Sequence, residues 1–212
     1  MRQITHHLPD WLIRSYAAGS LEHAFSLVVA SHVSQCDECR ARLEAEETAG
    51  GVILEQLEQT EVTGDLRTRV FEQLDVAEPI TTPDPAPSGI YPGALVAEMG
   101  SQTPRWRSLG NGIKQAILSA DKRGSARLLY IPAGKAVPDH THGGLELTLV
   151  LQGSFSDETG TFGVGDVEVA EDDLDHTPMA GPGEACICLA ATDAPLRFHG
   201  LIPRLLQPIF RI

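Results

Sequence analysis

The chain has 212 residues, a formal net charge of −13 and 42% hydrophobic residues. These values describe a globular protein with room for two small domains, and they argue against direct nucleic-acid binding, which needs a basic face. The apolar runs are too short to span a bilayer and no basic leader precedes an apolar stretch, so we expect a cytoplasmic protein without membrane contact.

The first part of the chain is predicted to be helical. Asp10 can cap a short helix that closes at Gly19, and Ser20 can cap a second helix whose apolar stripe ends at His32. A third helix is expected to begin near Asp37, because acidic residues are favourable at a helix N-terminus.

A fourth helix is predicted after Thr63-Gly64-Asp65, with apolar residues on one face at Leu66, Val70 and Leu74. Because it follows a polar stretch, we expect it to be detached from the other three. Residues 1–78 hold 14 acidic and six basic residues. That charge would suit a basic, DNA-binding protein as a partner, and solubility explains it equally well.

A proline-rich stretch divides the chain, because five of the 14 prolines lie within residues 79–92. Such a segment is expected to be an extended linker between a helical domain, 1–78, and a second domain, 93–212. The second domain contains short apolar runs between Gly or Pro turns, which is typical of an antiparallel β-sandwich or barrel. The expected strands are Ala126–Ile131, Leu147–Leu151, Gly165–Ala170 and Ala185–Ala191. The fold class is therefore α+β with two domains.

Metal-ligand residues gather in the helical domain as His32-x3-Cys36-x2-Cys39. His32 and Cys36 are four residues apart and so share a helix face, and soft thiolates with imidazole select zinc. A closed tetrahedral site needs a fourth ligand, which His7 or His6 can supply from the segment before the first helix, and we favour His7. A domain of this size gains stability from a structural zinc.

This run, with a histidine about 25 residues earlier, resembles the zinc-binding anti-sigma domain over roughly the first 76 residues. The resemblance implies that the domain sequesters an extracytoplasmic-function sigma factor and blocks its access to core RNA polymerase. It also implies that the fourth helix packs separately on the sigma factor.

A second metal-ligand set lies in the C-terminal domain. His140 and His142 lie two apart and project to one face of a strand, and Glu146 shares their parity. The spacing Gly134-x5-His140-x-His142-x3-Glu146-x6-Gly153 resembles the first cupin motif, and His176 stands where the second motif has its histidine. These four ligands would leave open positions on zinc, iron, manganese or nickel.

The second motif departs from the usual cupin pattern, because Ala180 replaces its asparagine and the turn before His176 is acidic. Cys186 and Cys188 alternate with apolar residues, so both thiols are expected on one face, as core residues or, alternatively, as a redox sensor. His23 and His199 are left unassigned.

The two domains together resemble the ChrR type of anti-sigma factor along the whole chain, including HAFSLVVASHVSQCDECR and VPDHTHGGLELTLVLQGSF. The resemblance implies a regulator without catalytic residues, in which the cupin domain is needed for release of the sigma factor in response to singlet oxygen. The alternative is a metal-dependent cupin dioxygenase with a zinc-stabilised helical appendage, and a third hypothesis is a small-molecule sensor.

Overall fold

The computed structural model describes residues 3–76, 86–100, 103–138, 140–141, 143–171, 175–194 and 197–198. Within them, five helices and an antiparallel β domain confirm the α+β class. The helices are α1 (Asp10–Ala17), α2 (His23–Val33), α3 (Asp37–Glu55), α4 (Leu66–Val76) and α5 (Gly93–Met99). Four of them were predicted, whereas α5 was not.

Asp10 and Ser20 are not the helix caps that the sequence suggested. Helix α1 begins at Asp10 itself, after Pro9, so the carboxylate lies in the first turn, where it favours the helix dipole. Helix α2 begins only at His23, because Ser20 takes part in the turn before it and donates its hydroxyl to the carbonyl of Ser15 at 3.1 Å.

The largest sheet has six strands, in the order β1-β2-β3-β11-β5-β8. Two three-stranded sheets, β10-β6-β7 and β12-β4-β9, accompany it. The large sheet comprises β1 (Arg107–Gly110), β2 (Ile113–Ala120), β3 (Ser125–Ile131), β5 (Glu146–Gln152), β8 (Val167–Ala170) and β11 (Cys186–Thr192). The smaller sheets comprise β4 (His140–Thr141), β6 (Ser154–Ser156), β7 (Thr161–Gly163), β9 (Asp175–His176), β10 (Met179–Ala180) and β12 (Arg197–Phe198).

The predicted strands correspond to β3, β5, β8 and β11, but β8 starts two residues later than expected. Gly165 has a φ of +90°, outside the extended region, and Asp166 accepts the backbone N–H of Gly163 at 2.8 Å. These two residues therefore lie in the turn between β7 and β8.

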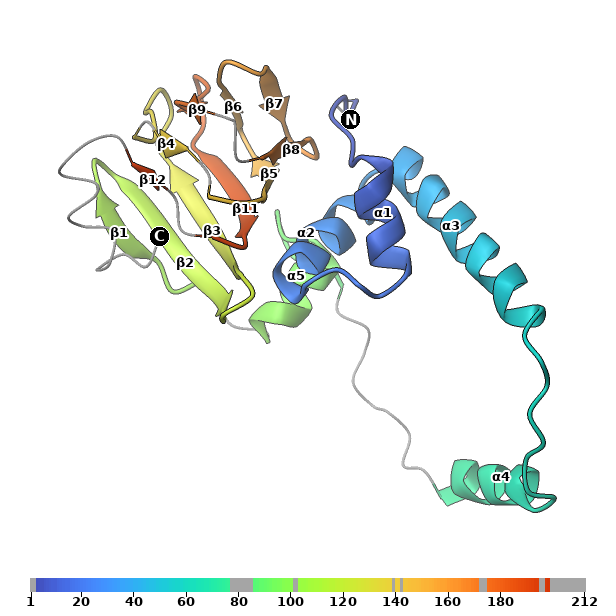
Figure 1. Cartoon of the computed structure of the whole chain (residues 1–212). Helices are drawn as coiled ribbons and strands as arrows, with labels where there is room; N and C mark the ends of the chain where they lie inside the picture. Colours follow the sequence, from blue (N-terminus) through green and yellow to red (C-terminus); the bar gives the residue numbers. More distant parts are fainter. Residues whose placement is uncertain are drawn as a thin grey trace.

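Both faces of the large sheet are buried along its inner strands β5 and β11. Leu128, Leu149 and Leu189 are cross-strand partners with no exposed surface, and they belong to the same core cluster as Phe25 and Val28 of α2. The other face carries Val150 and Cys188, which pack with Phe155 and Phe162 of the small sheet β10-β6-β7. The sheet is thus a middle layer between helices and a second β layer (Figure 1).

The helical part and the β domain share one hydrophobic core. Helix α2 contacts β3, β5 and β11, and α5 packs on α2 although it lies in the range predicted for the cupin domain. Of the predicted linker, residues 79–85 lie outside the described residues.

Helix α4 lies apart from the rest of the chain in Figure 1, beyond the end of the long helix α3. Its apolar side chains and those around the C-terminal end of α3 are exposed: Val52, Ile53, Leu54, Leu57, Val62, Leu66, Val70, Phe71 and Leu74. Among the described helices, none is long and apolar enough to cross a membrane.

Candidate metal centres

The structure gathers His7, His32, Cys36 and Cys39 in one cluster, with one ligand atom of each within 4.8 Å of the others. His32 lies in the last turn of α2, Cys36 precedes α3, and Cys39 lies in its first turn. The N–H of Cys36 donates to the carbonyl of His32 at 2.9 Å, and the N–H of Cys39 approaches the Cys36 sulfur at 3.5 Å. Local backbone geometry therefore places three of the four residues.

The distances within this cluster fit a tetrahedral metal. Nδ1 of His7 lies 3.2 Å from Sγ of Cys36 and 3.7 Å from Sγ of Cys39. Ligand atoms on a tetrahedral zinc, with the usual zinc–sulfur and zinc–nitrogen bonds, are about 3.5 Å apart. Nε2 of His32 is buried and has no hydrogen-bond partner among the described residues. A buried polar atom normally has a partner, so this nitrogen fits the role of a metal ligand.

Burial shapes the protonation of this cluster. It lowers the pKa of His32 to about 4, against the hydrogen bond to Gly165, so the imidazole is neutral and able to bind a metal. Burial raises the pKa of the Cys39 thiol to about 11, while the nearby Arg42 guanidinium favours the thiolate. Without a metal the Cys39 thiol is therefore protonated at neutral pH, and metal binding must release that proton.

His6 lies elsewhere. Its ring packs on Phe162, with centroids 4.4 Å apart, and its Nδ1 faces the carboxylate of Asp166 at 3.5 Å. His7 instead directs Nδ1 to the cysteines and Nε2 to the carboxylate of Glu38, at 3.3 Å. Of the two histidines left open by the sequence, the geometry brings His7 to the cluster.

The predicted ligands of the cupin domain are described only in part. His140 lies in β4, and its backbone pairs with His176 in β9, whereas its side chain and the whole of His142 lie outside the described residues. Glu146 begins β5, and its carboxylate accepts the hydroxyl of Thr148 at 3.0 Å.

His176 forms a buried cluster with two carboxylates that the sequence analysis missed. Its Nδ1 lies 2.6 Å from Asp157 and 3.5 Å from Glu168, and all three side chains are at most 4% exposed. Burial alone would lower the pKa of His176, but the hydrogen bonds to Glu168 and Asp157 raise it to about 9. Burial raises the pKa of Glu168 to about 7, and hydrogen bonds lower that of Asp157 despite its burial.

Asp157 and Glu168 therefore both face Nδ1 of His176. A carboxylate on Nδ1–H fixes the tautomer and orientation of a ligating imidazole, as is common around protein metal sites. Glu168 was detectable in the sequence as a single acid in the apolar strand VEVA. Asp157 carried no such signal, because it lies in the turn between β6 and β7.

Cys186 and Cys188 are reduced, fully buried neighbours with sulfur atoms 3.3 Å apart. Both thiols face one way, as predicted. The hydrogen bond between them, together with burial, raises the pKa of Cys188.

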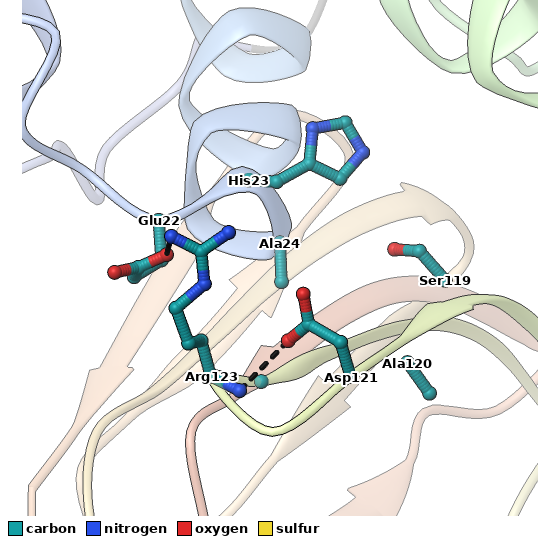
Figure 2. A pocket seen from close by; sticks show the side chains of 8 residues that line it. Glu22, His23, Ala24, Ser119, Ala120, Asp121 and Arg123 are labelled. Carbon is teal, nitrogen blue, oxygen red and sulfur yellow. Dashed lines mark hydrogen bonds and ion pairs between the residues drawn. The ribbon is translucent and has the colours of Figure 1, made fainter.

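A small pocket of about 130 Å³ lies at the opposite end of α2 from His32. Figure 2 shows it where the first residues of α2 meet the hairpin between β2 and β3, with Arg123 pairing with Glu22 at 3.2 Å. A Cβ on Gly124 would lie 3.7 Å from the Ala24 side chain. The hairpin therefore contacts the helix closely.

Comparisons with known proteins agree with these observations. Residues 97–195 match the ChrR cupin-like domain family. The chain is 52% identical over 213 residues to the anti-sigma-E factor ChrR of Cereibacter sphaeroides, covering 99% of each chain. It also resembles the crystal structure of Rhodobacter sphaeroides SigE in complex with the anti-sigma ChrR, with 49% identity, a TM-score of 0.79, and coverage of 90% of this chain and 100% of that one. The chain therefore belongs to the ChrR family of anti-sigma factors.

Proposed function

We propose that this chain sequesters an extracytoplasmic-function sigma factor in the cytoplasm through its zinc-bound helical domain. Release follows an oxidative signal of the singlet-oxygen type and requires the metal-bound cupin domain. The protein acts as a regulator and catalyses no reaction.

The observation that carries this proposal is the unpartnered apolar surface of α3 and α4. Val70, Phe71 and Leu74 of α4 are 47%, 57% and 64% exposed, and Ile53 and Leu54 of α3 are 64% and 68% exposed. A monomer rarely leaves so many large apolar side chains in contact with water, and such surfaces mark protein interaction sites. The solved relative was crystallised as a complex of SigE with ChrR.

Charge favours the same partner. Residues 1–78 carry an excess of acidic over basic residues, and α3 alone contains Asp37, Glu38, Glu44, Glu46, Glu47 and Glu55. A protein that binds DNA presents a basic surface, which an acidic helical domain attracts and covers.

In this proposal, the N-terminal metal site serves binding of the sigma factor, and the cupin metal site serves the response to the signal. His7, His32, Cys36 and Cys39 would hold zinc, which cross-links α2, α3 and the N-terminal segment and so stabilises the helical surface. His140, His142, Glu146 and His176 would hold the cupin metal, which is zinc or another divalent ion such as iron, manganese or nickel. This second centre keeps open coordination positions, so it suits a chemical signal.

The test is a pull-down of the zinc-loaded full-length chain against group IV sigma factors under reducing conditions, with and without a chelator. We expect chelator-sensitive capture of one sigma factor. A Phe71→Ala variant should bind it about 10- to 100-fold more weakly, because an aromatic side chain at the centre of an interface contributes strongly. The matched control is Met179→Ala in the cupin domain, where an apolar side chain of similar exposure, 48%, is truncated.

Failure to capture any sigma factor by the folded, zinc-loaded chain would refute the proposal. Oxygen consumption by an iron-loaded cupin domain would then favour the dioxygenase hypothesis.

A further inference from the structure

The turn between β7 and β8, formed by Gly165 and Asp166, contacts the N-terminal metal cluster from the cupin domain. Nδ1–H of His32 donates to the carbonyl of Gly165 at 2.9 Å, across 133 residues of sequence. Oδ1 of Asp166 accepts the backbone N–H groups of Thr5 and His6, at 2.7 and 2.9 Å. The N–H of Val167 in turn donates to the carbonyl of His6 at 3.3 Å.

We propose that Gly165 and Asp166 are positioning residues of the N-terminal metal centre, so that its affinity for metal depends on contact with the cupin domain. This inference rests on the metal centre of the proposed function. It adds that two of the four ligands are held in place by residues outside the helical domain.

The contact to His32 selects the nitrogen that binds the metal. Since Nδ1 carries the proton that is donated to Gly165, Nε2 holds the lone pair, and this buried Nε2 has no partner within the part of the chain that the structure describes. A hydrogen bond to the second nitrogen fixes both the tautomer and the ring orientation of a metal-binding histidine. Without the Gly165 carbonyl, this buried N–H would lose its acceptor.

The contact to Asp166 holds the segment that supplies His7. This segment belongs to no helix or strand, so it has no regular backbone hydrogen bonds of its own. Two N–H groups on one buried carboxylate oxygen hold Thr5 and His6 in place, and His7 follows directly. Oδ2 of the same carboxylate accepts the N–H of Gly163, which ties the segment to the turn.

Position 165 of this turn packs tightly against Ile4. A Cβ on Gly165 would lie 2.6 Å from Cδ1 of Ile4, and the φ of +90° favours glycine. The turn and the N-terminal segment are therefore in direct contact.

The same turn is continuous with the cupin cluster. Asp166 lies two residues before Glu168, which contacts His176. Gly165 and Asp166, which contact the N-terminal cluster, thus lie next to strand β8. Glu168, which contacts His176 of the candidate cupin centre, lies within that strand. A change at His176 that shifts β8 would act on both His7 and His32.

The test is cobalt binding to the full-length chain, followed by the thiolate-to-cobalt absorption band, which reports a centre with cysteine ligands. A Cys36→Ser variant sets the background of that band. We expect Asp166→Ala to lower the apparent cobalt affinity about 10- to 100-fold. The matched control is Asp193→Ala, since Asp193 also accepts a backbone N–H, that of Leu145 at 3.0 Å, but within the cupin domain. It should change the affinity less than about twofold.

A second variant tests the contact from the other side. Thr5→Pro removes one N–H donor to Asp166 without altering the cupin domain, and it should also weaken cobalt binding about 10-fold. If Asp166→Ala fails to fold, this variant decides alone.

Unchanged affinity in Asp166→Ala, or in Thr5→Pro if it stands alone, overturns the inference while the proposed function survives. Absence of the thiolate band in the wild-type chain refutes both the inference and the metal centre of the proposed function.

Discussion

Truncation of Val28 tests whether the helices and the β domain fold as one unit. Val28 is fully buried in α2, and it lies one turn from Ala24, which adjoins Gly124, and one turn from His32, which bonds to Gly165. Positions four apart share a helix face, so Val28 lies on the face that contacts the sheet.

The magnitude follows from the atoms removed. Val28→Ala deletes two buried methyl groups, worth about 0.8 kcal/mol each by transfer, and leaves a cavity. The expected loss of unfolding free energy is about 2 to 3 kcal/mol. With a urea dependence near 2 to 3 kcal/mol per molar, the midpoint should fall by about 1 M.

The two tryptophans allow each part to be followed separately. Trp11 lies in α1 and Trp106 precedes β1, and the chain contains no other tryptophan. Val28→Ala should therefore be measured by fluorescence in Trp11→Phe and Trp106→Phe backgrounds, and both transitions should shift together. The control Val70→Ala makes the same truncation on α4, at a side chain 47% exposed, and should change stability by less than about 0.5 kcal/mol. A shift of the Trp11 signal alone would show that α2 is not part of the core of the β domain.

Three further predictions concern the metals and the partner surface. Chelation of the N-terminal metal should loosen α1 to α3 and reduce the helical circular dichroism signal, because the metal contributes on the order of 10 kcal/mol to folding such modules; an unchanged spectrum would contradict this. Asp157→Asn should weaken metal binding at the cupin centre about 10- to 100-fold in equilibrium dialysis, since the carboxylate orients His176. The control Asp121→Asn alters a turn aspartate that accepts the N–H of Arg123, and equal losses in both variants would disprove the role of Asp157. Leu74→Ser on α4 should weaken sigma-factor binding at least about 10-fold while the melting temperature stays within about 2 °C, and an unaltered affinity would exclude α4 from the interface.

The helical cluster was predictable because most of it is local. His32, Cys36 and Cys39 lie within one helix end and one turn, so their spacing along the chain already places them together. His7 is remote in sequence, and the residues alone left it open against His6. The decision came from tertiary contacts, because His6 packs on Phe162 while His7 turns to the cysteines.

In the β domain, by contrast, the carboxylates that contact His176 of the candidate metal centre were not predicted from the sequence. Its alternating apolar strands were visible, yet the cluster around His176 was not, since Asp157 and Glu168 come from a turn and a neighbouring strand. Which residues meet across a sheet depends on strand order and register, and neither can be read from spacing.

The sequence by itself indicated the fold class, the clustering of His32, Cys36 and Cys39, and four strands of the large sheet, β3, β5, β8 and β11. Those features depend on periodicity and short-range spacing. Only the tertiary structure decided that α2 contacts the β domain at both ends, through the Glu22–Arg123 ion pair and the His32–Gly165 hydrogen bond, and that Asp166 binds the segment before His7. Such contacts join residues more than 90 positions apart, so they exist only once the shared core has formed.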